Sequence, residues 1–266
     1  MKGIVKKRKE TDKIYFSLER NDYMAISTFK RKEIKFILDE NQFLKLSSVL
    51  GQYMNPDEFC VDGKEYGIYN VYYDTPDNFL IRESLEKPYY KEKIRLRSYF
   101  SPAKDDDNVY LELKKKIGGI VTKRRISLTL GQANAFLLEG EIPDLSKSKK
   151  AYIQNQVLNE LVVFLKNYPV KPAQYISYQR SAYFGKDDGS FRLTFDRAIT
   201  QRRFDVGLDK PNYGIQILPP GQYLMEVKIG ASMPIWLSEQ LAEMGVYKTS
   251  FSKYGRAFKT FITQTK

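Results

Sequence analysis

The sequence predicts an α+β fold in which an antiparallel β-barrel keeps a basic polar lumen and packs its helices on the outside. Eight segments alternate charged with apolar residues, which is typical of strands that have one polar and one apolar face. Several amphipathic helices of the same chain need an apolar surface to pack on. If the sheet closes with its apolar faces outward, the helices find that surface and the charges line the interior.

The usual barrel has the opposite arrangement, with an apolar interior and a charged exterior, and it accounts equally well for any one strand. It would leave a helix such as residues 151–168 only a charged surface to pack on. Unpaired cations are very unfavourable in a dry interior. We therefore expect the inverted barrel, with a wet lumen that holds an anion.

The first third of the chain predicts two strands, each followed by a helix. Residues 31–39, "RKEIKFILD", alternate as a strand, and residues 40–54 have apolar residues at helical spacing. Residues 66–75 are rich in tyrosine and valine, as strands are. Residues 75–85 predict a short helix with Thr75 as its N-cap.

The next three strands carry the most regular charge. Residues 91–99, "KEKIRLRSY", predict a strand. Four basic side chains share one of its faces: Lys91, Lys93, Arg95 and Arg97. A hairpin follows, with arms at 108–119 and 119–130 and a turn at Gly118 and Gly119.

The rest of the chain predicts helices at 131–140, 148–168, 234–245 and 249–262. Strands are expected at 173–184, 191–200 and 223–230, with a long connection at 201–221. Charged strands thus lie on both sides of the central helices, and no linker separates them. We expect one domain over residues 29–266, preceded by a basic N-terminal extension, residues 1–28.

Composition restricts the chemistry. The 266 residues carry 44 Lys and Arg against 32 Asp and Glu, a net charge of +12, which favours an anionic partner. There are no histidines, so histidine bases are excluded and any metal must be held by oxygens. The only cysteine, Cys60, cannot form an internal disulfide, which fits a reducing compartment. No apolar run reaches the ~18 residues of a transmembrane helix, and we expect a cytoplasmic protein.

Eight short motifs occur in the order in which they occur in the VTC domain, the polyphosphate polymerase module of the CYTH-like triphosphate tunnel metalloenzyme superfamily. They are "RKEIKF", "YYDT", "KIRLRSY", "VYLELKKK", "VTKRRI", "FRLTFD", "LMEVKI" and "SFSKYGRAF". The chain resembles this family over roughly residues 29 to 262. The resemblance implies an eight-stranded tunnel, a divalent metal (Mn²⁺ or Mg²⁺) held by glutamate, and transfer of the gamma phosphate of ATP to a growing polyphosphate chain.

The resemblance also implies which residues form the site. Phosphate binding is expected of basic and hydroxyl side chains: Lys35, Arg95, Arg97, Lys114, Lys123, Arg125, Arg180, Arg192, Lys228, Ser252 and Lys253. Metal binding is expected of Glu226 in "MEVK", and Glu33 and Glu112 are further acidic candidates. Catalysis is expected of Arg95, Arg97, Lys114 and Glu226.

Three assignments stay open at this point. Glu112 either holds metal or pairs with Lys114. Lys91 and Lys93 lie either at the tunnel mouth or in solvent. Asp196 is either a second metal ligand or the salt-bridge partner of a neighbouring arginine.

We expect a metal-dependent polyphosphate polymerase that uses ATP. Phosphoryl transfer depends on charge neutralisation and in-line positioning, so a site without histidine is no obstacle. The alternatives are a hydrolase of tripolyphosphate or nucleoside triphosphates and a non-catalytic polyphosphate-binding protein. Nucleic acid is less favoured as a partner, because the charges alternate strictly within strands and a nucleic-acid surface would interleave exposed aromatic rings with them. The alternative stays open because of six tyrosines: Tyr69, Tyr72, Tyr73, Tyr89, Tyr90 and Tyr99.

Overall fold

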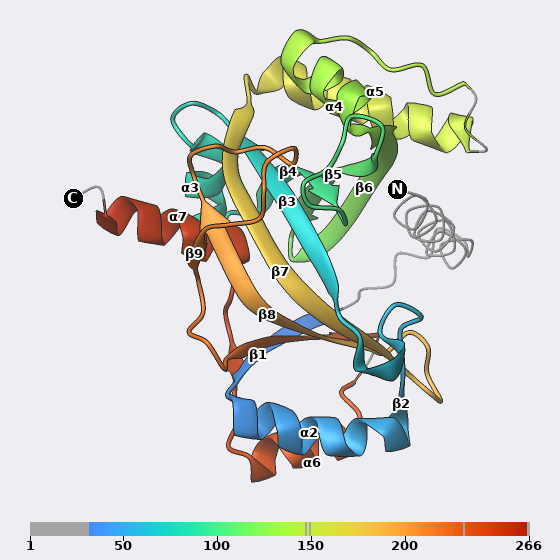
Figure 1. The fold of residues 1–266 in the computed structure, drawn as a ribbon, viewed down its shortest axis with the longest axis vertical. Coiled ribbons are helices and arrows are strands. Elements are labelled where there is room, and N and C mark those ends of the chain that lie inside the picture. The colour runs from blue at the N-terminus through green and yellow to red at the C-terminus, as the bar shows by residue number, and fades with distance from the viewer. Residues whose placement is uncertain (1–31, 147, 149, 231, 265–266) are drawn as a thin grey trace, which may run out of the picture.

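The computed structural model describes residues 32–264 except 147, 149 and 231, and its strands form one antiparallel sheet (Figure 1). The long strands are β1 (Lys32–Leu38), β3 (Tyr66–Asp74), β4 (Tyr90–Ser98), β5 (Asn108–Ile117), β6 (Ile120–Thr129), β7 (Lys171–Gly185), β8 (Arg192–Arg202) and β10 (Tyr223–Ile229). Three short strands are β2 (Met54–Pro56), β9 (Ile215–Gln216) and β11 (Lys248–Thr249). The predicted N-terminal extension, residues 1–28, lies outside the described residues.

The α+β class is confirmed, but the predicted count of eight strands is wrong, because the sheet has eleven. The eight predicted segments coincide with the eight long strands. The three additional strands have only two or three residues each, too few for an alternating pattern to show. One of them, β9, lies within residues 201–221, which the sequence presented as a connection.

The sheet is not a closed barrel, which corrects the second part of the predicted architecture. Its order is β11-β1-β10-β8-β7-β3-β4-β5-β6, and no backbone pairing between described residues joins β6 to β11 or β1. The first half of β6, including Lys123 and Arg124, is exposed. Charged side chains, especially lysines, are typical of edge strands, because they disfavour pairing with a further strand. The basic residues of β6 therefore give a physical reason for the open edge.

The sheet nevertheless curls around its polar side. Strands β3, β7 and β8 run between an upper part with β4, β5 and β6 and a lower part with β1 and β10 (Figure 1). Lys35 on β1 and Lys93 on β4 interact electrostatically although β10, β8, β7 and β3 separate them in the sheet. We call the concave side to which Lys35, Arg95 and Glu226 project the inner face.

Most helices cover the opposite, apolar side of the sheet, as predicted. α2 (Glu40–Tyr53) and α6 (Ile235–Glu243) pack on β1, β8 and β10 through a core that includes Leu46, Leu237 and Met225. α4 (Leu130–Asn134), the π-helical turn η3 (Ala135–Glu139) and α5 (Ala151–Asn167) cover β4, β5 and β6 (Figure 1). The basic inner face and the helices on the opposite side are thus two consequences of one alternating pattern.

Helices α3 (Phe79–Leu85) and α7 (Lys253–Gln264) depart from the prediction, because they lie over one end of the inner face. The ring of Tyr254 in α7 stacks on Tyr72, 4.6 Å between centroids, and Tyr72 lies opposite Arg95 in the sheet. Inner-face residues of β7 such as Tyr178 join the same apolar cluster. This end of the inner face is therefore covered by helices.

Helix α3 begins at Phe79, later than the predicted N-cap at Thr75. The carboxylate of Asp74 accepts two backbone N–H groups of the helix, over 2.9 and 3.0 Å, and the hydroxyl of Tyr254 over 2.7 Å. Thr75 contributes its Oγ1, which accepts the N–H of Phe79 over 2.8 Å. Because Asp74 is fully buried, it ties the start of α3 to α7.

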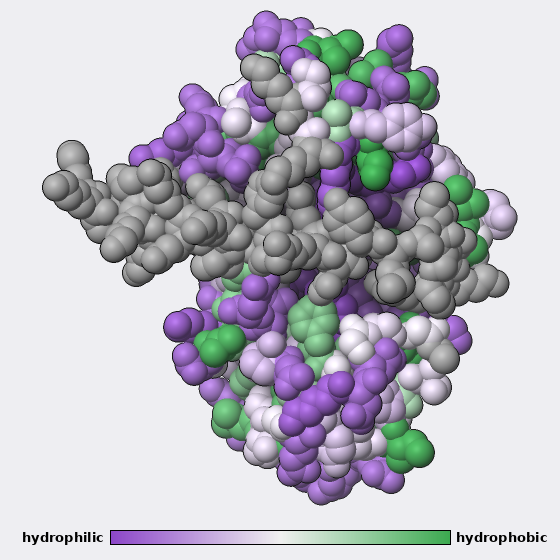
Figure 2. All heavy atoms as spheres, turned by 90° about the vertical axis from the view of Figure 1, so that its right-hand side faces the viewer, coloured by the Kyte–Doolittle hydropathy of each residue, from purple (hydrophilic) through white to green (hydrophobic). Residues whose placement is uncertain are grey.

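Figure 2 shows the side of the molecule that lies to the right in Figure 1, and most of its coloured surface is hydrophilic. Hydrophobic side chains occur there in small separate groups over the upper and lower parts. In the part of the chain that the structure describes, none of the helices combines the length and the apolar character needed to span a membrane.

Candidate functional site

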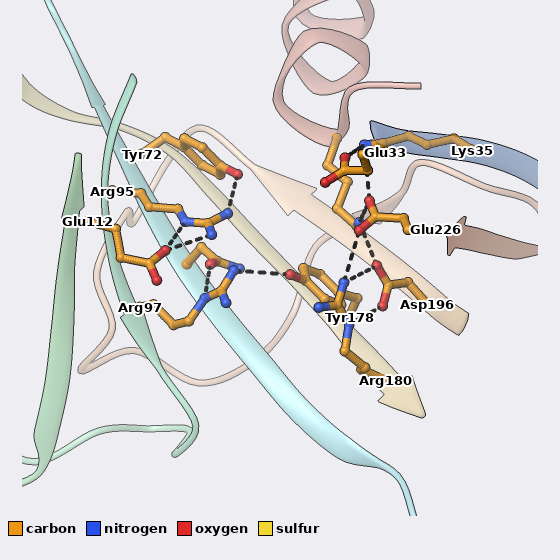
Figure 3. A network of polar contacts seen from close by, with 12 residues as sticks. Glu33, Lys35, Tyr72, Arg95, Arg97, Glu112, Tyr178, Arg180, Asp196 and Glu226 are labelled. Atoms are coloured by element: carbon orange, nitrogen blue, oxygen red, sulfur yellow. Dashed lines mark hydrogen bonds and ion pairs between the residues drawn. The ribbon is translucent and has the colours of Figure 1, made fainter. Parts of the chain in front are cut away.

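Charged side chains from most of the long strands meet on the inner face. The backbone register places them: Glu226 on β10 lies opposite Lys35 on β1, and Arg95 on β4 lies opposite Glu112 on β5. Side chains directly opposite each other project to the same face of a sheet. Two polar centres result, one around Glu226 and one around Arg95 (Figure 3).

The first centre surrounds the carboxylate of Glu226 with cations. Its Oε1 lies 3.1 Å from Lys35 Nζ and 3.0 Å from Lys253 Nζ, and its Oε2 lies 3.4 Å from Nη2 of Arg180. Burial alone would raise the pKa of Glu226, but Lys253, Lys35 and Arg180 together hold that pKa well below its ordinary value. Glu226 is therefore a fixed negative charge on the inner face.

Asp196 completes the first centre as a salt-bridge partner. Nε and Nη2 of Arg180 donate to its two oxygens over 2.6 and 2.8 Å, and Lys253 Nζ lies 2.5 Å from Oδ2. Burial opposes the charge of Lys253, but Asp196 and Glu226 outweigh it and raise the pKa of the ammonium group. Of the two roles that the sequence left open for Asp196, the structure shows the salt bridge.

Glu33 and Glu226 are the carboxylates that fit a divalent metal. Lys35 Nζ lies 3.2 Å from Glu33 Oε1 and 3.1 Å from Glu226 Oε1, so the two carboxylates already share one cation. Within the described ranges, no group of three or more acidic or cysteine side chains forms a metal cage. Mg²⁺ needs only one or two carboxylates when substrate phosphates and water complete its shell. An oxygen-only pair of this kind fits Mg²⁺ or Mn²⁺ bound together with a phosphate substrate.

The second centre fixes the orientation of Arg95. Its Nε and Nη2 lie 2.7 and 2.6 Å from Oε2 of Glu112, and its Nη1 donates to the hydroxyl of Tyr72 over 3.0 Å. Glu112 is 1 % exposed, and Lys123 Nζ lies 3.5 Å from its other oxygen. Burial opposes the charge of Glu112, but Arg95 and neighbouring cations keep its pKa well below the ordinary value.

Glu112 lies apart from the first centre. Figure 3 shows it beside Arg95, while Glu226 lies with Glu33 and Asp196. Of the two roles left open for Glu112, ion pairing is observed, although with Arg95 and not with Lys114. We propose that Glu112 orients Arg95 rather than binding a metal.

Arg97 is oriented by hydrogen bonds to neutral partners. Its Nε donates to Oδ1 of Asn70 over 3.0 Å and its Nη2 to the hydroxyl of Tyr178 over 3.3 Å. Both partners are neutral, so the charge of Arg97 is not cancelled by them. Two oriented guanidinium groups, two residues apart on β4, present the planar donor geometry that matches phosphate oxygens.

Lysines crowd the inner face beside Arg95. Between described residues, no carboxylate comes within ion-pair distance of Lys93, whose Nζ lies 5.8 Å from the ring centroid of Tyr254. Burial, Lys114, Lys91 and Lys35 together lower the pKa of Lys93 to about 7. Lys91 is anchored by α3, since its Nζ donates to a carbonyl oxygen of that helix over 2.9 Å. An unpaired group of lysines at this place favours a bound anion.

The hairpin residues expected to bind phosphate lie on the same face but are more accessible. Lys114 is exposed, and the side chain of Lys123 is 47 % exposed. Arg125 is half-buried, and its guanidinium lies 4.9 Å from the ring centroid of Tyr110. These three side chains border the inner face along the open edge of the sheet.

Arg192 and Lys228 lie opposite each other on β8 and β10. Burial and the nearby Arg180 and Arg192 lower the pKa of Lys228 to about 8, although Glu33 and Glu226 act in the opposite direction. Both side chains therefore add positive charge next to the first centre.

Ser252 and Lys253, which were expected to bind phosphate near the C-terminus, lie in two different environments. Ser252 is exposed, and its Oγ accepts the backbone N–H of Gly255 over 3.1 Å, as an N-cap does. Lys253, the next residue, lies between Asp196 and Glu226. The structure thus brings Lys253 into the first centre and leaves Ser252 at the start of α7.

The model of the VTC domain matches residues 30–262, nearly the whole chain. The chain belongs to this family. The match confirms the resemblance that the ordered motifs gave. The strands that carry the two polar centres lie within this range, and helix α7 begins in it.

Several solved structures are similar to this VTC domain, of which three are described here, and no curated protein matches its sequence. Two are described as "putative adenylate cyclase". The one from Bacillus halodurans is 14% identical with a TM-score of 0.49, covering 84% of this chain and 95% of its own. The one from Vibrio parahaemolyticus is 13% identical with a TM-score of 0.41, covering 85% and 97%. The Mimivirus capping enzyme triphosphatase is 10% identical with a TM-score of 0.32, covering 88% and 95%. Similarities of this size transfer no activity.

The sequence did not predict the roles of several neutral residues in the VTC domain site. Asn70, Tyr72 and Tyr178 hold the guanidinium groups, and Tyr254 packs on Tyr72. Asn70 and Tyr72 stand two apart on a predicted strand, so alternation could have placed them on one face. The position of Tyr254 depends on how α7 packs, and the motif "SFSKYGRAF" indicated only that the neighbouring Lys253 reaches the site.

Proposed function

We propose that this VTC domain is a metal-dependent polyphosphate polymerase that transfers the γ-phosphate of ATP to a growing polyphosphate chain. The observation that carries the proposal is a continuous inner face on which basic side chains outnumber carboxylates. Its cations are Lys35, Lys93, Arg95, Arg97, Lys114, Lys123, Arg125, Arg180, Arg192, Lys228 and Lys253. Its carboxylates are Glu33, Glu112, Asp196 and Glu226. Such an excess of positive charge attracts an anion.

The proposed reaction needs no side chain that accepts a proton. A terminal phosphate oxygen of the polymer attacks the γ-phosphorus of ATP, the bond from that phosphorus to the β-phosphate oxygen breaks, and ADP leaves. The attacking phosphate is already ionised at neutral pH. The absence of histidine from the sequence agrees with this chemistry.

The side chains would act by neutralising and orienting phosphates. Arg95 and Arg97 are held by their neighbours before any substrate binds, so little reorganisation is needed when charge develops on the transferred group. Lys35 and Lys253 lie at the other centre and bring positive charge close to Glu226. A metal held by Glu226 and Glu33 would add neutralisation of phosphate oxygens.

The test is incubation of the purified protein with γ-labelled ATP and either Mn²⁺ or Mg²⁺, with polymer and orthophosphate resolved on a gel. Glu226→Gln removes the charge but keeps the shape, and circular dichroism checks that the variant folds. Glu243→Gln is the matched control, since Glu243 pairs with Lys45 on an exposed surface far from the inner face.

We expect label in polymer with the unmodified protein and with Glu243→Gln, and loss of that product with Glu226→Gln or a chelator. Label in orthophosphate alone would identify a triphosphatase instead. Binding of tripolyphosphate without either product would identify a non-catalytic binding protein.

A further inference from the structure

The end of the β5–β6 hairpin carries a cluster of exposed apolar side chains. Ile117 and Ile120 lie opposite each other on either side of the turn, and Tyr90 lies opposite Ile117 on β4. Tyr89 precedes Tyr90, and Val121 follows Ile120. All five side chains are between 41 % and 76 % exposed. We call these five residues the apolar tip.

The turn inside the apolar tip consists of two glycines. Gly118 and Gly119 both have a positive φ, 53° and 89°, as the two central residues of a tight hairpin turn require. A Cβ atom on Gly118 would lie 3.0 Å from the ring of Tyr89, so this ring packs against the turn. A Cβ atom on Gly119 would have no neighbour within 4 Å. The apolar tip is therefore open on the side of Gly119.

Helix α5 packs on the hairpin but leaves its end uncovered. The carboxylate of Glu160 in α5 lies 3.6 Å from Lys115 Nζ and 3.1 Å from Nη2 of Arg124. Ile117 follows Lys115 by two residues on the same side of β5, and it is exposed. The apolar tip thus continues the helix-covered side of the sheet beyond the part that α5 covers.

Cations without carboxylate partners border the apolar tip. Residues 114–125, "KKKIGGIVTKRR", contain six basic residues and no acidic one. Lys116 lies opposite Lys91, and Lys87 precedes Tyr89 by two residues. Burial and the nearby ammonium groups of Lys116 and Lys87 lower the pKa of Lys91. Among the residues that the structure describes, no carboxylate comes within ion-pair distance of these three lysines.

An exposed apolar end with cations around it matches the surface of an anionic bilayer. The headgroups of such a bilayer are negative, and apolar side chains can enter about 5 to 10 Å into the boundary with the acyl chains. The net charge of +12 acts in the same direction. A second copy paired along β6 would instead bring basic residues of two strands together, which is unfavourable.

We propose that the apolar tip inserts into the headgroup region of an anionic lipid bilayer, with Lys87, Lys91 and Lys116 on the lipid phosphates. The proposal concerns a surface outside the two polar centres and goes beyond the proposed function. It holds whether the inner face transfers, hydrolyses or only binds phosphates.

The first test is sedimentation of the purified protein with vesicles of phosphatidylcholine, alone or mixed with anionic phosphatidylglycerol. We expect binding to the mixed vesicles. Ile117→Ser and Ile120→Ser should each weaken it about 10-fold, because they remove apolar surface without changing charge. Lys116→Gln should weaken it about 5-fold. Ile235→Ser, at an exposed position on α6, is the matched control and should bind like the unmodified protein.

The second test asks whether the apolar tip reaches the acyl chains. Trp236, the only tryptophan, lies on α6 and stacks on Tyr53. Bromine atoms on the acyl chains quench a tryptophan that touches them. We expect mixed vesicles with brominated lipid to quench Tyr89→Trp, and to quench neither the unmodified protein nor the control Tyr247→Trp, which is exposed elsewhere. Absence of quenching in Tyr89→Trp would overturn the proposal.

Other results assign the apolar tip differently. Binding to mixed vesicles that Ile117→Ser and Ile120→Ser leave unchanged would mean that other cations hold the lipid, and would overturn the proposal. No binding to either kind of vesicle would overturn it as well. A dimer in sedimentation velocity that Ile120→Ser converts to a monomer would show that a second copy covers the tip. None of these results affects phosphate binding on the inner face.

Discussion

Lys253 Nζ and the carboxylate of Glu226 lie 3.0 Å apart and join helix α7 to strand β10. The same ammonium group lies 2.5 Å from Asp196, and the side chain of Lys253 is 9 % exposed. One buried cation thus bridges two carboxylates from neighbouring strands. The start of α7 is therefore part of the charge balance of the inner face.

Lys253→Met should destabilise the fold and leave Glu226 and Asp196 without one of their counter-charges. Removing one partner of a buried ion pair leaves uncompensated charge, and we expect the free energy of unfolding in urea to fall by about 3 kcal/mol. Mg²⁺ should restore more stability to this variant than to the unmodified protein, because Glu226 then lacks one of its counter-charges. Lys45→Met, which breaks an exposed pair with Glu243, should cost less than about 1 kcal/mol. Identical responses to Mg²⁺ would contradict the assignment of Glu226 to metal binding.

Glu112→Gln should lower stability by about 3 kcal/mol at pH 7, because Arg95 loses its buried counter-charge. The pKa of Glu112 is depressed, so its contribution is complete above the unfolded pKa near 4.5 and is lost as pH falls through the folded pKa. The difference between the two proteins should stay constant from pH 7 to about 5 and shrink below it. Urea unfolding of both proteins across this pH range measures the difference in free energy of unfolding. A difference that does not change as the pH falls below about 5 would argue against an ionised, buried Glu112.

Affinity for tripolyphosphate should fall as pH rises through neutrality. Lys93, with its pKa lowered to about 7, is cationic below that pH and neutral above it, and only the cation attracts phosphate. Lys93→Met should remove the part of the fall that is centred near pH 7, an effect of about 5-fold for one charge contact. Lys123 and Lys228, whose pKa values are both lowered to about 8, keep a second step near pH 8 in both proteins.

Titration calorimetry between pH 6.5 and 9 records these curves. Lys166→Met, at the end of α5, serves as the control because it lies on the outer side of the sheet. Parallel curves for Lys93→Met and the unmodified protein would mean that Lys93 does not face the anion.

Tyr254→Phe should weaken the attachment of α7. The hydroxyl of Tyr254 donates to the buried carboxylate of Asp74, and losing a donor to a buried acceptor costs about 1 to 3 kcal/mol. We also expect weaker tripolyphosphate binding, because the adjacent Lys253 is positioned by the same helix. Tyr152→Phe, an exposed tyrosine, should change neither quantity. If Tyr254→Phe is destabilised but binds tripolyphosphate with unchanged affinity, the attachment of α7 through Tyr254 does not position Lys253 for the anion.

Much of the fold could be predicted because alternation persists along the long strands. The charged row of residues 91–99 became β4 with Arg95 and Arg97 on the inner face. Whether the sheet closes into a barrel could not be predicted, since alternation identifies the two faces of a strand but not whether the two edge strands of the sheet meet. The start of α7 was indicated by the motif that contains Lys253, but the packing of the rest of this helix was not, because an amphipathic helix can cover either side of a curved sheet.

The sequence predicted which charged residues form the candidate site, but not which of them form ion pairs with each other. For Glu112 the sequence left open metal binding or pairing with Lys114, but the register places Glu112 opposite Arg95 on the neighbouring strand, and the two form an ion pair. Pairing across strands depends on register, and a slip of one residue would reverse every face. Neutral partners such as Asn70 carry no charge pattern, so their role emerges only from the folded geometry.

The unpaired edge of β6 has a consequence for how a long polymer could reach the inner face. A tunnel closed by hydrogen bonds all round would admit a polymer only by threading one of its ends, and α3 and α7 cover one end here. Among the described strands, β6 can separate from β1 and β11 without breaking any backbone ladder. A strand of phosphates could therefore be laid in sideways, and its length and its distant ends would not limit its access.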